Sequence, residues 1–271
     1  MKRATHPLIF GWLLMFIAAA PANPYLLHLP GIGGHMRIDD LLTTGLMRGA
    51  IDAQIEIYDW TKGNPGMPAL TNYERNRLEA KNVTDLLVKV HRADPSRRIM
   101  ITCHSGGGGI AIWALEQLPD DVQIDTLLMV ASALSPEYDL SNALRHVRGH
   151  AYAFNSVYDP ILSFGTRNFG TMDRVMGESA GFSGFIMPAG ADKKQYAKLV
   201  QVPYDASWMR LGNAGDHIGA MNVLFARTII APLLLTGQLP KLPSTQPSTQ
   251  SMPLTPALSP AYRGEGAGVR P

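Results

Sequence analysis

Ser105 stands in front of four consecutive glycines in the segment ITCHSGGGG, residues 101–109. A phosphate-binding P-loop would end in lysine followed by serine or threonine, but Ile110 and Ala111 follow these glycines. A flexible linker is also excluded, because an apolar strand pattern precedes the segment and an apolar helix pattern follows it. The remaining interpretation is that Ser105 is a nucleophile.

A nucleophilic serine of this kind occupies a strained turn between a strand and a helix, called a nucleophile elbow. The turn requires small residues two positions before and two positions after the serine. Cys103 and Gly107 occupy these positions. The usual residue at the first position is glycine, so Cys103 is a departure, although cysteine is still compact. We expect Cys103 to be a packing residue of the elbow and not the nucleophile.

An elbow serine needs a histidine as base, and three histidines follow Ser105. His146 falls in an expected helix and His150 begins an expected strand, which favours structural or surface roles for both. His217 lies in the loop GNAGDHIGAM, after the last expected strand and before the final helix. The catalytic histidine of an elbow serine follows both the serine and the acid along the chain. We therefore predict that His217 is the base.

The acid that holds the base is expected between the serine and the histidine. Asp159 follows the fifth expected strand in FNSVYDPI, where Pro160 forces a turn. Asp139 follows the fourth expected strand and is the alternative, although its surroundings favour a helix N-cap. Asp216 adjoins His217 and is interpreted as a loop carboxylate. Asp159 is the predicted acid.

The segment HLPGIGGH follows the first expected strand. A dinucleotide-binding fingerprint would need a third glycine where Met36 stands, and no helix opens directly after it. Glycines here instead allow backbone N–H groups to turn toward a reacting carbonyl. By position, the N–H groups of Ile32 and Gly106 would form an oxyanion hole.

Strand and helix patterns alternate along the chain, which predicts an α/β fold with a mostly parallel sheet and helices on both faces. Thr71 and Glu74 have the spacing of a capping box and predict the start of a helix. Residues 163–190 are expected to be irregular. Six strands are expected at 23–30, 53–60, 97–103, 123–132, 149–159 and within 198–217, with helices at 38–48, 71–91, 106–118, 139–147 and 218–236.

Together these motifs resemble the α/β-hydrolase family: LPGIGG after the first strand, CHSGG at the elbow, YDP after the fifth strand and GDHIG before the last helix. The resemblance covers residues 23–237 and is nearest to compact lipases and esterases. It implies a triad of Ser105, His217 and Asp159 that forms an acyl-enzyme and needs no cofactor. The chain departs from the family in that only six strands are readable, so the antiparallel first strands of the family are not expected. The connection between the fourth and fifth expected strands is too short for a large cap domain.

Composition limits the partners of the chain. Hydrophobic residues make up 46% of the sequence and the formal net charge is only +2, with scattered basic residues. Neither a nucleic-acid footprint nor a polybasic membrane patch is therefore expected. Cys103 is the only cysteine, which excludes an intramolecular disulfide and a cysteine-based zinc site. We expect a small-molecule partner and no metal; the sequence does not indicate an oligomeric state.

The substrate is expected to be an apolar acyl ester. Hydrophobic residues of the 163–190 segment either wall an acyl pocket or pack beneath a surface loop; these are Phe164, Phe169, Met172, Met176, Phe182, Phe185 and Met187. Two alternatives remain open for the function: a non-catalytic binding protein of the same fold, or a thioester- or C–C-cleaving hydrolase with the same triad.

The two ends of the chain have a different character from its middle. Lys2 and Arg3 precede a 13-residue apolar run, Leu8 to Ala20, and small residues follow, which is typical of a secretory signal peptide over residues 1–22. This run is short for a membrane span. We expect an exported protein, or alternatively one held at a membrane by an uncleaved segment. Residues 238–271 are rich in Pro, Ser, Thr and Gly and are expected to be disordered.

Overall fold

A computed structural model describes residues 23–242 of the chain. Residues 23–240 belong to a single unit. The expected signal peptide, and the expected tail from residue 243 onward, lie outside the described residues. Within residues 23–242, no helix combines the length and the apolar character that a membrane crossing requires.

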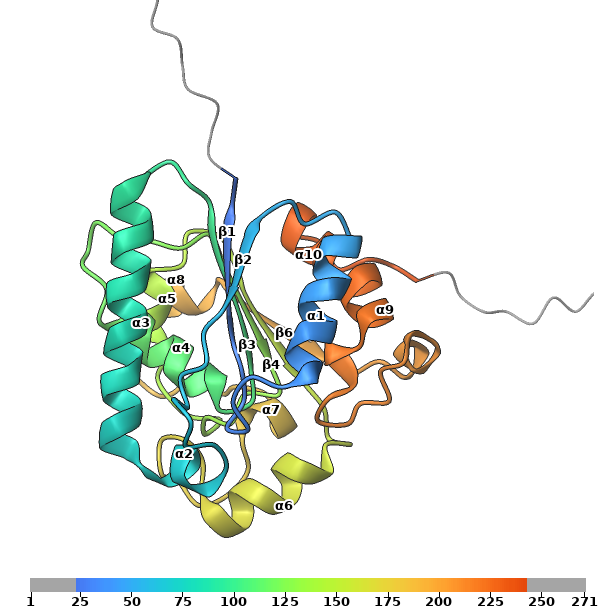
Figure 1. Ribbon diagram of the computed structural model, residues 1–271. Helices are drawn as coiled ribbons and strands as arrows, with labels where there is room; N and C mark the ends of the chain where they lie inside the picture. Colours follow the sequence, from blue (N-terminus) through green and yellow to red (C-terminus); the bar gives the residue numbers. More distant parts are fainter. Residues whose placement is uncertain (1–22, 243–271) are drawn as a thin grey trace, which may run out of the picture. The chain divides into compact units, whose positions relative to one another are not determined.

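The core of this unit is a six-stranded sheet in the order β2-β1-β3-β4-β5-β6, in which all neighbouring strands are parallel (Figure 1). The chain runs from β1 outward to β2 and then crosses to β3 on the other side of β1. The strands are β1 Tyr25–Leu29, β2 Gln54–Ile57, β3 Ile99–His104, β4 Thr126–Val130, β5 Ala151–Asn155 and β6 Leu199–Pro203.

Helices cover both faces of the sheet (Figure 1). On one face lie α3 Tyr73–Ala93, α4 Gly107–Glu116, α5 Ser141–Arg145 and α8 Lys193–Tyr196. On the other face lie α1 Arg37–Arg48, α9 Val223–Phe225, the π-helical turn η3 Ala226–Ile230 and α10 Ala231–Thr236. Beyond the carboxyl ends of the strands lie α2 Met67–Thr71, α6 Pro160–Phe169 and α7 Ala180–Ser183. Two short 3₁₀ helices, η1 Ala206–Leu211 and η2 Gly219–Met221, follow β6.

The burial of each strand follows from its position in the sheet. Every residue of β1, β3 and β4 is buried, as parallel strands covered on both faces require, whereas the edge strands β2 and β6 are half exposed. The expected α/β fold, with a mostly parallel sheet between two helical layers and no large cap, is confirmed.

Several expected boundaries were wrong. The helix at 71–91 is capped by Asn72, whose side chain accepts a hydrogen bond from Arg75 N, and not by Thr71. Thr71 instead ends the separate helix α2 and donates to Met67 O. Residues 163–190 are not wholly irregular, because they contain most of α6 and all of α7.

The region after β6 also differs from expectation. The WMRL segment, expected within the last strand, forms the 3₁₀ helix η1, and Asp205 caps it by accepting from Ser207 N. The final helix is not continuous over 218–236. Asn222 caps a new start at α9, and Pro232 has no N–H to donate, so the turns before it widen into η3.

The glycine run is required by close packing at the start of α4. A Cβ atom at Gly107 would lie 2.3 Å from Leu29 O and 2.4 Å from Pro30 O, and a Cβ atom at Gly108 would lie 2.6 Å from Ser132 Oγ. Only glycine allows α4 to approach the end of β1 this closely. The run therefore holds the first turn of α4 against two loops that border the carboxyl edge of the sheet.

We expect Gly107→Ala to destabilise the fold by about 2 kcal/mol, because the added methyl group would overlap backbone atoms that cannot move aside. Gly165→Ala in α6 is the matched control: no atom lies within 4 Å of its added Cβ, so it should stabilise the fold by about 0.5–1 kcal/mol. Urea unfolding measures both changes. A Gly107→Ala midpoint at or above the wild-type value would contradict the packing argument.

Candidate active site

Ser105 forms the apex of the turn between β3 and α4, as the sequence predicts. Its φ of +52° is in the left-handed region, which non-glycine residues enter only when the surroundings hold them there. Ser105 N donates to Val130 O at 2.9 Å, and Ser105 O accepts from Ala133 N at 3.1 Å. These bonds to the β4 end fix the backbone on both sides of the serine side chain.

His217 and Asp159 meet at this edge of the sheet, 58 residues apart in sequence. His217 Nδ1 donates to Asp159 Oδ2 at 2.7 Å, and the Asp159 side chain is only 1% exposed. The bond leaves Nε2 as the free ring nitrogen of a neutral His217, available as a proton acceptor. The structure thus brings the predicted base and acid together.

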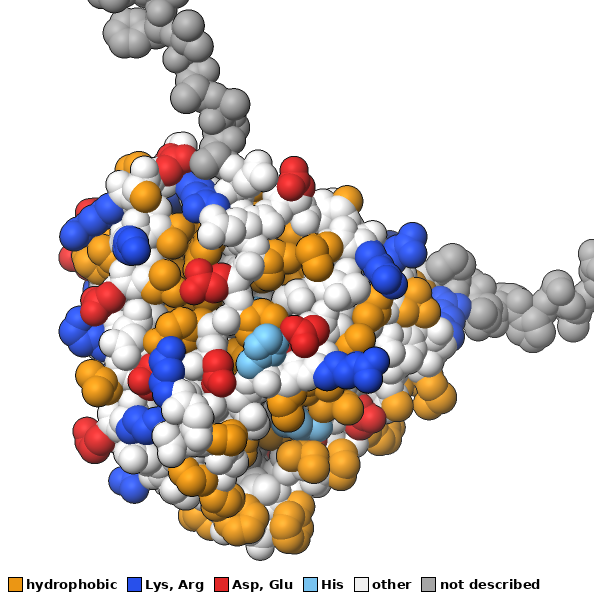
Figure 2. Space-filling model, viewed as in Figure 1, with side chains coloured by type: hydrophobic (Ala, Val, Ile, Leu, Met, Phe, Trp, Pro, Cys, Tyr) orange, Lys and Arg blue, Asp and Glu red, His pale blue; other side chains and the backbone are white. Residues whose placement is uncertain are grey.

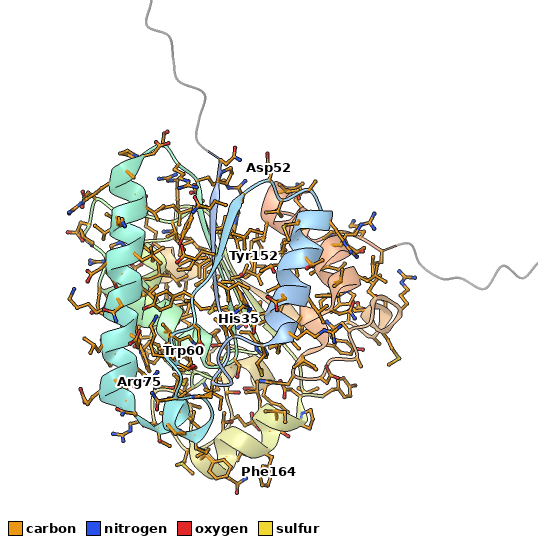
Figure 3. All side chains as sticks on the ribbon, viewed as in Figure 1. His35, Asp52, Trp60, Arg75, Tyr152 and Phe164 are labelled. Carbon is orange, nitrogen blue, oxygen red and sulfur yellow. The ribbon has the colours of Figure 1, made fainter. Side chains whose placement is uncertain are left out.

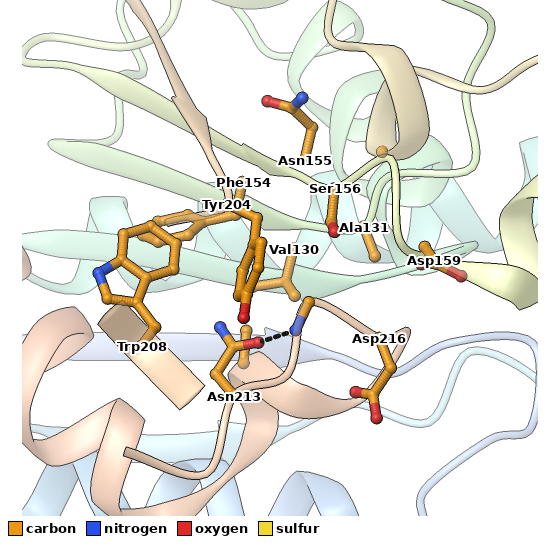
Figure 4. A pocket seen from close by; sticks show the side chains of 13 residues that line it. Val130, Ala131, Phe154, Asn155, Ser156, Asp159, Tyr204, Trp208, Asn213 and Asp216 are labelled. Atoms are coloured by element: carbon orange, nitrogen blue, oxygen red, sulfur yellow. Dashed lines mark hydrogen bonds between the residues drawn. The ribbon is translucent and has the colours of Figure 1, made fainter. Parts of the chain in front are cut away.

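Asp159 lies four residues beyond the end of β5 and is the N-cap of α6. Its second carboxylate oxygen, Oδ1, accepts from Leu162 N at 2.9 Å. Asp159 also borders a small cavity of about 30 Å³, lined by Phe154, Tyr204 and Trp208 (Figure 4). The carboxylate is therefore held from two directions and kept away from bulk water.

The loop that carries His217 is stabilised by its own glycines and by Asn213. Asn213 is buried, and its Oδ1 accepts from Gly215 N at 2.9 Å, the bond drawn in Figure 4. Gly215 has a φ of +80°, which the loop needs in order to turn back toward Asp159. Asp216 is exposed, and Figure 4 shows its carboxylate directed away from Asp159. Asp216 is thus a loop carboxylate, as expected.

Ile32 and Gly106 lie beside each other, since a Cβ atom at Gly106 would be 2.6 Å from Ile32 Cγ2. Within residues 23–242, neither the Ile32 N–H nor the Gly106 N–H donates a hydrogen bond. Both groups are therefore available to an oxygen atom next to Ser105.

The Ile32 loop, residues 30–36 between β1 and α1, is held by hydrogen bonds from Trp60 and Gly66. Trp60 Nε1 donates to Pro30 O at 2.7 Å, and Gly66 N donates to Ile32 O at 2.7 Å. Arg75 of α3 in turn donates to Trp60 O at 2.7 Å; both side chains are labelled in Figure 3. The loop backbone is thus held in place by residues that do not touch the serine.

Ser105 and His217 line the same cavity, which has a volume of about 460 Å³. Its apolar wall consists of Ile32, Met36, Ile38, Pro160, Ile161 and Ile218. Figure 2 shows hydrophobic side chains continuing over the lower part of this face, where Figure 1 places α6. The exposed side chains of Ile161, Phe164 and Phe169 belong to that helix. The site can therefore accommodate an uncharged, apolar group.

The hydrophobic residues of the 163–190 segment, for which both a pocket wall and packing beneath a surface loop were open, do not line the cavity around Ser105. Met172 is buried against Gly109, and Phe185 is buried, whereas Phe164, Phe169, Met176 and Met187 are exposed. None of the seven lines the cavity around Ser105. Of the helix that begins after Asp159, the cavity wall includes only Pro160 and Ile161.

The alternative acid and the other histidines lie away from His217. Asp139 is exposed, accepts from Ser141 N, and borders a different hollow. His146 is buried and bonded to Val122 O, and His150 is exposed on the surface. These positions agree with the structural roles predicted for both histidines.

A buried polar cluster next to the site was missed in the sequence. His28 Nε2 donates to Asp39 Oδ1 at 2.8 Å, and Thr102 Oγ1 lies 3.0 Å from His28 Nδ1. Asp39 also accepts from Met36 N at 2.8 Å, which ties the Ile32 loop to α1. The one available signal was His28 within an otherwise apolar strand. Within the part of the chain that the structure describes, no group of three or more His, Cys, Asp or Glu side chains could hold a metal ion.

Comparisons with known proteins identify similar structures but no sequence relative. No family model matches the chain, and neither does any curated protein. Among solved structures, a predicted CIB-like hydrolase from Thermoplasma acidophilum is 16% identical, with a TM-score of 0.44, over 80% of this chain and 88% of that one. A protein from Xanthomonas campestris pv. campestris, assigned as a hydrolase of the alpha/beta superfamily, is 17% identical, with a TM-score of 0.42, over 79% and 99%.

An esterase domain from Rhodothermus marinus is 13% identical, with a TM-score of 0.43, over 80% of this chain and 87% of that one. These proteins are what the chain is similar to. Its fold assignment depends on its own strand order and on the turn at Ser105.

Cys103 occupies the position where an elbow usually has glycine, and its side chain is buried with 1% exposure. Burial raises the pKa of its thiol, so the reactive thiolate is disfavoured. We expect Ellman's reagent to find no accessible thiol in the folded protein and one thiol per chain after denaturation. Fast reaction of the folded protein would contradict this assignment of Cys103 as a packing residue.

Proposed function

We propose that this protein is a serine hydrolase that cleaves carboxylic esters with apolar acyl groups. One observation carries the proposal: a serine in a left-handed turn lies on the same cavity as a histidine that is bonded to a buried carboxylate. A core histidine or a surface serine would need none of these features. Together they supply the three parts of a serine-hydrolase triad: a nucleophile, a base, and a carboxylate that orients the base.

In the proposed reaction, His217 Nε2 takes the proton of Ser105 Oγ while that oxygen attacks the acyl carbon. Asp159 keeps the proton of His217 on Nδ1 and stabilises the imidazolium that forms. The imidazolium then protonates the departing alcohol, which leaves an acyl-enzyme on Ser105. Water, deprotonated by His217, hydrolyses this ester and restores the serine.

The oxyanion of each tetrahedral intermediate would accept from the N–H groups of Ile32 and Gly106. Where it has been measured, one such donor is worth about 3–4 kcal/mol of transition-state stabilisation. Both donors are backbone groups in segments that other residues hold in place, so they need little reorganisation when the negative charge develops.

An ester with an apolar acyl chain suits the cavity better than a charged substrate. Six apolar side chains form its wall, and the carboxylate of Asp216 at the cavity lining would repel an anionic group. A thioester would fit the same geometry, and a non-catalytic binding protein of the same fold is the other alternative. The position of Ser105 on the cavity and the pairing of His217 with Asp159 favour catalysis over binding alone.

The first test combines covalent labelling with turnover. A fluorophosphonate should label Ser105, and p-nitrophenyl esters of increasing acyl length should be hydrolysed, because His217 activates Ser105 for attack on both. Ser105→Ala should lose labelling and turnover, whereas Cys103→Ala should keep both, since Cys103 only packs against the elbow.

An active Ser105→Ala variant together with an inactive Cys103→Ala variant would show thiol chemistry instead. Binding of esters without labelling or hydrolysis by the wild type would favour a binding protein. Faster turnover of acyl thioesters than of matched oxygen esters would indicate that the protein is a thioesterase.

The second test concerns the acid. In Asp159→Asn, the amide oxygen can still accept from Leu162 N and cap α6, so the fold should persist. The amide NH₂ would then face His217 Nδ1 and force the wrong tautomer. We expect kcat to fall by about 10⁴-fold, the size of the effect when the triad aspartate of a serine protease is replaced by asparagine. Asp139→Asn is the control and should leave kcat unchanged; a comparable loss in that variant would make Asp139 the acid.

A further inference from the structure

His104 lies between Cys103 and Ser105, as the last residue of β3, and its side chain reaches the loop of the base. Its Nε2–H donates to the backbone carbonyl of His217 at 2.9 Å. The two imidazole rings also contact each other, with centroids 4.7 Å apart and planes tilted by 51°. The residue that directly precedes Ser105 in the sequence is thus hydrogen-bonded to His217.

The protonation state of His104 follows from its surroundings. The side chain is buried, with His104 only 3% exposed, and burial lowers its pKa to about 3, with the neighbouring His217 acting in the same direction. A neutral imidazole has a single N–H, and the carbonyl of His217 requires it on Nε2. Nδ1 is then an acceptor, and it lies next to Gly31, where an added Cβ atom would be 3.2 Å away.

A purely structural role does not explain this side chain well. Within residues 23–242, His104 Nδ1 is buried without a hydrogen-bond partner, which costs stability. An aliphatic or aromatic residue would fill the same space without that cost. The bond to His217 O is the feature of His104 that such a residue could not supply.

We propose that His104 is a positioning residue that fixes the location of His217 relative to Ser105. Asp159 holds the His217 ring through Nδ1, and His104 holds the His217 backbone through its carbonyl. Because Ser105 is the next residue after His104, this second bond sets the distance from nucleophile to base. The inference rests on the proposed function, since it assigns a role in the same reaction.

Two variants separate the hydrogen bond from the ring. His104→Phe keeps a planar ring in the cavity and removes the donor. His104→Gln places an amide N–H near the former Nε2 position and can donate to His217 O again. We expect His104→Phe to lower kcat by about 10- to 100-fold, because small misplacements of catalytic groups have effects of this size. KM for a p-nitrophenyl ester should change less than about twofold, since His104→Phe keeps an aromatic ring at the place where His104 lines the cavity and leaves the other lining residues unchanged.

His104→Gln should recover most of the lost kcat, and both variants should show melting temperatures close to wild type. Wild-type kcat in His104→Phe would overturn the inference. Loss of kcat in both variants in proportion to a lowered melting temperature would also overturn it and leave only a role in packing. The fluorophosphonate labelling rate of Ser105 should follow kcat.

The labelling rate also separates the two proposals. A wild-type protein that is neither labelled nor active on esters would contradict the proposed function, and therefore also this inference. A wild type that is labelled and active, with a His104→Phe variant labelled at the same rate, would remove the inference alone.

Discussion

The site depends on one backbone constraint, the left-handed conformation of Ser105 at the end of β3. A non-glycine residue held in this region costs about 1–3 kcal/mol, which the surrounding structure must offset. The offset comes from hydrogen bonds to Val130 and Ala133 and from the packing of α4. Nine of the ten residues of α4 are buried, so the helix cannot shift without exposing apolar surface. Ser105 is thereby held at the carboxyl edge of the sheet, where it lines the cavity.

The sheet topology explains why the other groups meet at this edge. In parallel α/β sheets, ligands bind where the strand order reverses, outside the carboxyl ends of the strands. Here the order reverses between β1 and β3. The Ile32 loop follows β1 and Ser105 follows β3, so the proposed oxyanion donors and the proposed nucleophile flank the reversal. Asp159 and His217 arrive from the loops after β5 and β6, on the same edge.

The sequence was informative where local chemistry dictates structure. The elbow could be predicted because glycines at 107–109 and a serine after an apolar strand have few other uses. Asp159 and His217 could be predicted from their places after strands. Helix boundaries were less accessible, because Asn72 and Thr71 are both good caps and only tertiary packing selects between them. The cavity wall was also missed, since contact between Ile161, Ile218 and Ile38 depends on how three separate segments pack.

The packing of α1 has a consequence for biosynthesis. Gly45 of α1 and Gly49, the residue that caps the C-terminus of α1, lie against Ala226 and Ala231, so the first described helix packs on the last helical turns. A nascent chain emerging from the ribosome therefore exposes the apolar face of α1 until nearly all of the unit has been made. His217 comes in the same late segment. The candidate site and the first described helix are thus completed together, late in the translation of the unit.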